Sequence, residues 1–417
     1  MLKPVTTKLK NRVKNRIIKL HKKSPLVFIS DTTLRDGEQM PGASMTPEDK
    51  VEIAKALAKI GVHSIDAGFP AAAPSEIQAI QRIVREVKGP FISALCRTTK
   101  SDIDSAKLAL EEAPFWRRGV SLFIGTSPVH RQDKLKMSKT ELIKLVTSSI
   151  EYARKSFDMV VFGPEDASRT EIPFLCEIYR EAILAGATTI GFPDTIGILT
   201  PAKVKETLFK IQDHVPEMDQ VLLAVHMHND LGLATANSLA AVEAGANIVQ
   251  CTVNGIGERA GNASLEEVVM ALKMNQDEFQ RQVNIDSTQL LALSRLVAQR
   301  SQIPVSLLKP IVGENIFATE AGIHQDGLLK NPQTYLPFLP DVVGAEGIKL
   351  VLGKHSGKKA FSQRLEQLGL RLTKEQVNQI TDKIIDVEKE CWKDADSLLI
   401  KTSHDLFDVK PTYTFGQ

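Results

Sequence analysis

The sequence predicts a TIM (β/α)8 barrel with an appended, mostly helical C-terminal region. Short apolar or β-branched runs alternate with amphipathic helical patterns at regular intervals from residue 26 onward, which is typical of a parallel sheet built from βα units. Eight such runs occur within about 250 residues, the number that a closed barrel requires. A doubly wound sheet more often has about five to seven strands.

Each predicted strand is followed by a turn signal or a polar stretch. The strands are expected at residues 26–33, 64–70, 91–97, 120–127, 159–166, 189–195, 222–230 and 248–257. The segments between them have the periodicity of amphipathic helices, for instance 46–60 and 138–156. Pro201 occupies the first-turn position that proline favours in a helix.

Three segments are expected along the chain: a basic N-terminal extension at 1–25, the barrel domain at 26–275 and helical C-terminal subdomains at 276–417. The alternation of strands and helices stops near residue 275. The region that follows contains one helical pattern, then a segment with many Gly and Pro residues, then two further helical patterns. The helical patterns span 286–302, 358–368 and 373–393, and the punctuated segment spans 310–357.

Composition excludes several classes of protein. The chain has 417 residues, 43% of them hydrophobic and 24% charged, which is typical of a soluble globular protein rather than a disordered one. No apolar run approaches the length of a membrane span, so none is expected. The four cysteines are far apart, which is typical of a reducing compartment and predicts a cytoplasmic location.

The N-terminal arm is strongly basic. Nine of the 52 Lys and Arg residues lie within the first 30 positions, where no acidic residue occurs. A transit peptide for an organelle, a polyanion-binding tail and a solvated extension all remain open for this arm. The arm has no aromatic residue before Phe28 and no basic stripe continues beyond it, so we do not expect a nucleic-acid partner.

Polar stretches follow four of the eight predicted strands, at 31–39, 165–166, 226–230 and 254–262. Because the active site of a parallel barrel lies at the carboxyl ends of its strands, these stretches are expected to converge on one mouth. The sequence therefore places the candidate site there.

His226 and His228 are two residues apart on a strand, so both imidazoles face the same side and could hold one metal ion, although such a pair is often an ordinary core feature. Arg35 and Asp36 are adjacent in the chain. One of them, the carboxylate, could ligate the metal while the guanidinium stabilises an oxyanion. Alternatively, the two residues form an ion pair that closes the barrel. Nitrogen and oxygen ligands without a thiolate suit Mg²⁺, Mn²⁺ or Zn²⁺. Glu165 could be a base, a partner of another side chain or a helix cap.

Seven motifs resemble those of the 2-isopropylmalate synthases, metal-dependent Claisen-condensing acyltransferases built on a barrel. They are DTTLRDGEQ at 31–39, AGFP at 67–70, PDTIG at 193–197, HMHNDLG at 226–232, NGIGERAGN at 254–262, GIHQDG at 322–327 and GKHSG at 353–357. The resemblance covers residues 26 to about 370. It implies that acetyl-CoA condenses with a 2-oxo acid to give a 2-alkylmalate and CoA.

The resemblance also implies roles for single residues. Arg35 would stabilise the keto oxygen of the acceptor as it becomes an alkoxide, and Thr195 would hold the acceptor's carboxylate. Glu165 would position or polarise the acetyl group. The divalent cation would be bound by Asp36, His226, His228 and Asn262.

Two further residues lie beyond the barrel. His324 would take part in deprotonating the methyl group of acetyl-CoA, with Tyr335 nearby. In the family this region reaches over the barrel of a second subunit, so a homodimer is expected. Long members of the family continue into a leucine-sensing domain; this chain ends at Gln417, so no leucine-regulatory domain and no inhibition by leucine are expected.

The choice of acceptor rests on four pocket positions. Val161 stands where the similar homocitrate synthases place an arginine for a second carboxylate, so we expect an apolar 2-oxo acid, because a buried unpaired carboxylate costs several kcal/mol. Ser121, Gly163 and Gly191 are smaller than the residues usual in bacterial 2-isopropylmalate synthases. Both 3-methyl-2-oxobutanoate and a longer analogue, as used by methylthioalkylmalate synthases, therefore remain candidates.

Other functions are weaker alternatives. Citramalate and homocitrate synthases share the motifs, and a catalytically dead barrel used as a binding scaffold is the alternative outside enzymes. A dead barrel is expected to have lost some of the residues that carry the chemistry. Arg35, Asp36, His226, His228 and His324 are all retained.

Overall fold

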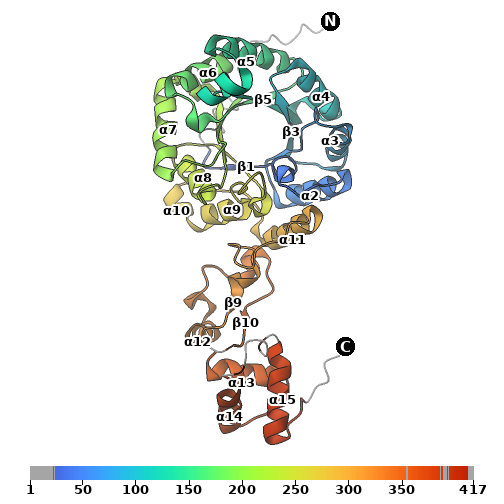
Figure 1. The fold of residues 1–417 in the computed structure, drawn as a ribbon, viewed down its shortest axis with the longest axis vertical. Helices are drawn as coiled ribbons and strands as arrows, with labels where there is room; N and C mark the ends of the chain where they lie inside the picture. The colour runs from blue at the N-terminus through green and yellow to red at the C-terminus, as the bar shows by residue number, and fades with distance from the viewer. Residues whose placement is uncertain are drawn as a thin grey trace. The chain divides into compact units, whose positions relative to one another are not determined.

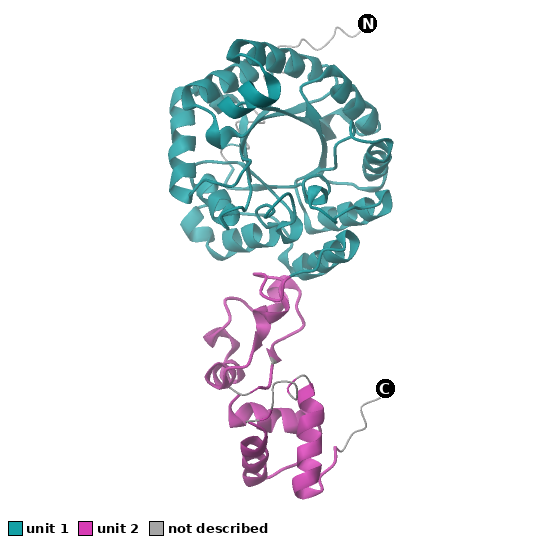
Figure 2. Cartoon of the chain, viewed as in Figure 1, with its two compact units in different colours: residues 1–305 teal, residues 306–417 magenta. Residues whose placement is uncertain are grey.

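The computed structural model describes residues 24–353, 356–385 and 394–411, together with positions 22, 387 and 392. Nearly all of the expected basic extension at 1–25 lies outside these residues. The chain divides into two compact units, residues 1–305 and 306–417, which Figure 2 distinguishes by colour. No helix in the described parts of the chain has the length and apolar character that a membrane crossing requires.

The first unit is a closed barrel of eight parallel strands in which each strand pairs with the next and β8 pairs with β1. Figure 1 shows the helices as an outer ring around these strands. The strands are β1 (Phe28–Asp31), β2 (Ser64–Asp66), β3 (Phe91–Arg97), β4 (Arg118–Gly125), β5 (Met159–Glu165), β6 (Thr189–Asp194), β7 (Leu222–Met227) and β8 (Ile248–Cys251). The predicted fold class is confirmed.

The helices of the ring follow the strands in alternation. They are α2 (Pro47–Ile60), α3 (Pro74–Glu86), α4 (Lys100–Leu110), α5 (Lys139–Ala153), α6 (Ile172–Leu184), α7 (Pro201–His214), α8 (Ala234–Glu243) and α9 (Leu265–Met274). Helix α2 shows how the sequence sets their limits: Thr46 and Asp49 form a capping box, and Gly61 ends the helix in the left-handed region.

Several strands end earlier than predicted. The strand expected at 64–70 ends at Asp66, the strand expected at 222–230 ends at Met227, and the one expected at 248–257 ends at Cys251. Beyond these points the backbone turns into loops over the mouth; Asn254, for example, has φ 61°. Two of these overshoots, after β7 and β8, fall on polar stretches at the mouth, and the third falls on the segment AGFP at 67–70.

The first unit also extends past the division expected after residue 275. It includes α10 (Gln276–Phe279) and α11 (Leu290–Ser301). Helix α11 packs against α2, and its face of Leu290, Leu293 and Val297 is buried. This apolar face explains why the division falls at 305: without α11, one side of the barrel's helical ring would expose apolar surface.

The second unit is mostly helical, as predicted. Its short parallel strands β9 (Ala318–Thr319) and β10 (Lys349–Leu350) accompany α12 (Gly322–Lys330), a helix that we did not predict within the punctuated segment. Phe361, Ile380 and Leu399 are fully or almost fully buried in a separate apolar core. The helices that contribute to this core are α13 (Lys358–Gln367), α14 (Lys374–Ile384) and α15 (Ala395–Phe407).

Candidate active site

A cavity of about 300 Å³ lies in the first unit and is lined by residues from all eight barrel strands and their carboxyl ends. Nine of the predicted site residues line it: Arg35, Asp36, Ser121, Gly163, Glu165, Gly191, Thr195, His226 and His228. Asn262 joins this group through a hydrogen bond to Asp36. The mouth of the barrel thus brings together residues that are separated by more than 200 positions in the chain.

Asp36, His226 and His228 form a cluster with the geometry of a metal site. One ligand atom from each of the three lies within 4.8 Å of the others. The two imidazole Nε2 atoms are 3.1 Å apart, and His226 Nε2 is 3.6 Å from Asp36 Oδ2. Two ring nitrogens and a carboxylate that converge in this way form a donor set suited to a divalent cation.

Asn262 completes the cluster. Its Nδ2 donates to Asp36 Oδ1 at 2.7 Å, whereas its Oδ1 is buried and has no hydrogen-bond partner among the described residues. The amide oxygen is therefore available as a fourth ligand. Gly257 has φ +158°, and a Cβ there would collide with both Asn262 and Asp36, so the loop approaches the cluster only because this residue is glycine.

The protonation states of the cluster also suit a metal. Burial on its own would raise the pKa of Asp36, but the charge of Arg35 and the hydrogen bond from His226 hold this pKa well below 3.8. Burial, followed by the charge of His226, lowers the pKa of His228 to about 3. At neutral pH the cluster accordingly has an ionised carboxylate and a neutral imidazole, the forms that bind metals.

Arg35 is held from two sides. Its Nη1 donates to Asp36 Oδ2 at 2.6 Å, and its Nε donates to Asp66 Oδ2 at 2.9 Å. Neither of these two contacts uses Nη2, which remains able to donate to a bound oxyanion. Asp66 ends β2, and we did not predict its role, although the rule that strand ends line the mouth applies to it equally.

Glu165 ends β5 and pairs with a cation. Lys134 Nζ donates to both carboxylate oxygens at 3.0 Å, and His130 Nδ1 lies 3.7 Å from Glu165 Oε2. Both partners belong to one π-helical segment, His130–Leu135. We did not predict this segment, because its residues have neither strand nor ordinary helix periodicity.

Thr195 follows β6 and is fixed by two contacts. Its Oγ1 accepts a hydrogen bond from Asp166 N at 2.9 Å, which leaves the hydroxyl hydrogen free to donate. Its carbonyl oxygen accepts from Arg259 Nη2 at 2.6 Å, and Arg259 in turn pairs with Asp230. These contacts of Arg259 were also not predicted, because they join two loops that approach each other only when the barrel has formed.

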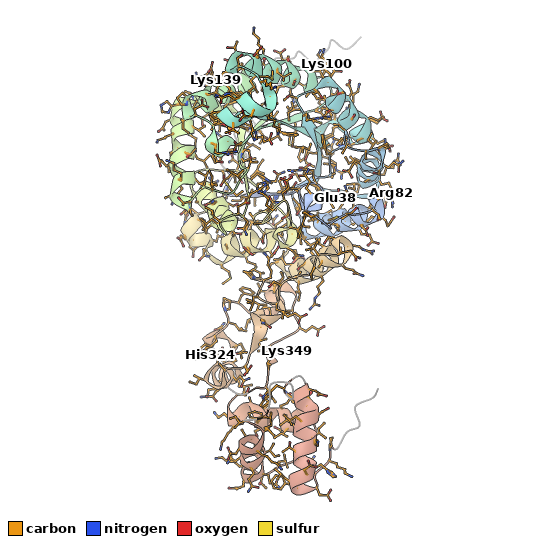
Figure 3. The ribbon with its side chains drawn as sticks, viewed as in Figure 1. Glu38, Arg82, Lys100, Lys139, His324 and Lys349 are labelled. Atoms are coloured by element: carbon orange, nitrogen blue, oxygen red, sulfur yellow. The ribbon has the colours of Figure 1, made fainter. Side chains whose placement is uncertain are left out.

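His324 and Tyr335 belong to the second unit. Figure 3 labels His324, which lies on α12. Its ring centroid is 4.1 Å from that of Tyr335, with the two planes at 32°. The expected neighbourhood of these two rings is present.

The fold and the cluster at its mouth define an α/β barrel with a candidate metal site. A family model described as HMGL-like matches residues 27–297, and one described as homocitrate synthase post-HMGL domain-like matches residues 311–390. In fold the chain is similar to a hydroxymethylglutaryl-CoA lyase from Pseudomonas aeruginosa, with a TM-score of 0.57 and 20% identity over 67% of this chain and 94% of that one.

Curated relatives narrow the family. The chain is 46% identical to a 2-isopropylmalate synthase from Rhodopirellula baltica, over 93% of this chain and 74% of that protein. It is 48% identical to one from Pyrococcus furiosus, over 87% and 72% respectively. The chain therefore belongs to the 2-isopropylmalate synthase family, which confirms the resemblance of its motifs, and it is an enzyme of the acyltransferase class.

Proposed function

We propose that this protein condenses acetyl-CoA with a 2-oxo acid that has an apolar side chain, to form a 2-alkylmalate and CoA. The observation that carries the proposal is the convergence of Asp36, His226 and His228 at the mouth of a cavity that also holds Arg35. A divalent cation bound there by these three ligands and Asn262 would polarise the keto group of the acceptor. Mg²⁺, Mn²⁺ and Zn²⁺ are the candidate cations, and elemental analysis of the purified protein identifies the one that is bound.

The residues around the cluster would share the work of binding the acceptor. Thr195 keeps its hydroxyl hydrogen available because Asp166 N already bonds its oxygen, so it can donate to the acceptor's carboxylate. Arg35 is fixed by Asp36 and Asp66 and would donate to the keto oxygen as negative charge develops on it. A donor fixed in advance stabilises such charge without a cost of reorganisation.

The acetyl group requires a base and a positioning group. Glu165, held by Lys134, would orient the thioester. His324, stacked against Tyr335, would remove the weakly acidic methyl proton, after which the carbanion carbon attacks the keto carbon and the alkoxide is protonated. Water then cleaves the thioester and releases CoA.

The cavity favours an acceptor without a second carboxylate. Among the described residues that line it, Arg35 is the single Lys or Arg, and Asp36 and Asp66 already neutralise it. Leu95, Phe123 and Val161 provide apolar contacts for the acceptor's side chain. We therefore propose that the acceptor is 3-methyl-2-oxobutanoate or a longer 2-oxo acid with an uncharged side chain. A diacid, as used by homocitrate synthases, is disfavoured.

A homodimer is part of the proposal. The second unit carries His324 next to Ile323, whose exposed fraction is 80%, and Leu308 is 79% exposed. Large exposed apolar side chains beside a catalytic candidate favour a contact with a partner subunit. A cytoplasmic location stays a prediction from the sequence.

Release of the CoA thiol tests the reaction. Turnover should require acetyl-CoA, a 2-oxo acid and a divalent cation, and should disappear after chelation and return with added metal. Asp36→Asn should lower metal content, measured by elemental analysis, and should reduce kcat by about 100-fold or more. Full turnover after exhaustive chelation would refute the proposal.

A further inference from the structure

The inner part of the cavity is lined by neutral polar side chains. They lie deeper in the barrel than Asp36, His226, His228 and Asn262, which we call the metal-ligand cluster. Each belongs to a strand and precedes the carboxyl end of that strand by at least one residue. These residues are Ser30, Ser64, Ser93, Ser121, Thr189 and Gln250, which we call the inner chamber.

The register of the sheet places three of these residues side by side. Ser30 on β1 pairs with Gln250 on β8 and with Ser64 on β2. Ser64 is two positions before Asp66, the partner of Arg35, so it faces the same side of the strand one layer further inside. On its other side Gln250 pairs with His226, so these polar side chains form a continuous row that leads from the candidate metal ligands into the barrel.

These side chains leave hydrogen-bonding capacity unused. Within the described residues, no hydrogen bond is recorded for the side chains of Ser30, Ser64, Ser121, Thr189 or Gln250, and Ser93 Oγ is no closer than 3.5 Å to Ile65 O. Barrel interiors are normally filled by branched apolar side chains. Small hydroxyl groups leave space instead, and polar groups that line a cavity are satisfied by water or by a ligand.

The charges around the cavity restrict what that partner can be. Asp36, Asp66, Glu165 and Glu258 line the cavity, and Arg35 is the single lining Lys or Arg among the described residues. A distal carboxylate would find no unengaged Lys or Arg among these lining residues, because Asp36 and Asp66 already engage Arg35. The nearest lining carboxylate, Asp66, has its charge neutralised by Arg35, so it offers a distal cation no unpaired negative charge; its buried Oδ1 has no partner among the described residues and remains an acceptor for a neutral donor.

We infer that the inner chamber binds an uncharged, hydrogen-bonding group at the far end of the acceptor, which would be a 2-oxo acid with an apolar stem and a polar tip such as a hydroxyl. This inference rests on the proposed function and specifies its substrate class. The stem would contact Leu95, Phe123 and Val161, and the tip would displace water from Ser30, Ser64 and Gln250.

Two acceptors of equal length test the inference on the unmodified enzyme. In 6-hydroxy-2-oxohexanoate a terminal hydroxyl replaces the terminal methyl of 2-oxoheptanoate. CoA release should give a kcat/KM at least about tenfold higher for the hydroxy acid, because a site that hydrogen-bonds a hydroxyl discriminates strongly against an analogue lacking it. In the double variant Ser30→Ala/Ser64→Ala this ratio should fall to about one.

Ser148→Ala serves as the matched control, because Ser148 is exposed on α5 and bonds only Leu145 O. It should leave the ratio unchanged. If the double variant does not fold, Ser64→Ala alone and the comparison on the unmodified enzyme decide.

A ratio of one or less, or a preference for 2-oxohexanedioate, while CoA release proceeds would overturn the inner chamber and leave the proposed function standing. Absence of CoA release with every 2-oxo acid would instead overturn the proposed function. Calorimetric binding of the same acceptor pair would then decide the chamber separately, with tighter binding of the hydroxy acid supporting it and equal binding refuting it.

Discussion

Gly163 leaves a gap in the wall of the cavity. A Cβ built at this position would have no heavy atom within 4 Å, and the backbone is not in the left-handed region. A larger residue there is therefore compatible with β5 and would occupy space that the acceptor's side chain uses. A Cβ added at Gly191, on the neighbouring strand, would lie 3.4 Å from Gly163 Cα, but Gly191 has no side chain to close the gap.

Gly163→Val should shift the enzyme toward shorter acceptors. We expect kcat/KM for 2-oxoheptanoate to fall by about 10- to 200-fold relative to 3-methyl-2-oxobutanoate, the range that a methylene-sized change in a pocket produces. The free energy of unfolding should change by less than about 1 kcal/mol, because no neighbour is displaced. Gly347→Ala, a change in similarly open space in the second unit, should leave the ratio unaltered. An unchanged ratio in Gly163→Val would show that the acceptor does not reach this wall.

Asp31 gives the first unit a pH dependence of its own. Burial outweighs the two hydrogen bonds from Thr33 and raises the pKa of this carboxyl to about 7, from 3.8. Between these values the folded protein keeps a proton that the unfolded chain has lost. Asp31 therefore contributes stability that is fully present below about pH 4 and is lost as the pH rises through about 7.

Asp31→Asn should remove this loss. Relative to the unmodified protein, the variant's free energy of unfolding should rise as the pH is raised from 5 to 8, by up to several kcal/mol, since each unit of pKa corresponds to about 1.4 kcal/mol. Urea unfolding of both proteins at each pH, in the presence of a chelator, measures this difference in the free energy of unfolding. Asp286→Asn is the control: Asp286 also bonds a threonine two residues on, but it is exposed and its pKa is lowered, so its effect should be constant over this range. A parallel pH profile for Asp31→Asn and the unmodified protein would contradict the assignment.

For single site residues, the sequence predicted positions that depend on one strand and missed contacts that depend on the assembled barrel. His226 and His228 were placed together by the two-residue period of β7, and Asp36 by its position after β1. Asp66, Lys134 and the contact between Arg259 and Thr195 join elements that are far apart in the chain. No local pattern encodes such contacts, so they became visible only with the fold.

Helix α11 lies in the first compact unit, whereas the sequence pattern placed it after the barrel domain. Its apolar face was visible as a helical pattern at 286–302, but the pattern did not specify the surface that it covers. In the structure this face packs against α2 and the loop at Val253–Gly255. The loop carries Asn254, whose side chain bonds Ser294 of α11, so the helix supports the backbone next to the metal-ligand cluster.

Leu293→Ala should destabilise the first unit. Leu293 is 3% exposed on α11, and loss of a buried leucine side chain costs about 2–5 kcal/mol. Thermal or urea unfolding should show this loss in the transition of the barrel. The control is Leu184→Ala on α6 of the same unit, at a residue that is 64% exposed, which should change the free energy of unfolding by less than about 0.5 kcal/mol. Equal effects of the two changes would show that α11 is not part of the barrel's core.

The residues that we propose for the chemistry lie in both units of the molecule. Arg35 and the metal-ligand cluster belong to residues 1–305, whereas His324 and Tyr335 belong to residues 306–417, which have their own apolar core. The proposed mechanism needs both sets of residues at one acceptor. A homodimer in which the second unit of each subunit serves the barrel of its partner would meet this need, and it makes a prediction that no single-chain arrangement makes.

Subunits of Arg35→Ala and His324→Ala should complement each other. Each variant alone should have less than about 1% of the normal kcat, because each lacks a group needed in every site. After subunit exchange in an equal mixture, half of the dimers are mixed, and in each of these one site has both an intact barrel and an intact His324 from the other subunit. The mixture should therefore recover about a quarter of the normal activity. A mixture of Asp36→Asn with Arg35→Ala is the control, since both changes lie in the barrel and every site stays defective. Sedimentation must show dimers before and after mixing, and a dimeric mixture without recovered activity would mean that each second unit serves its own barrel.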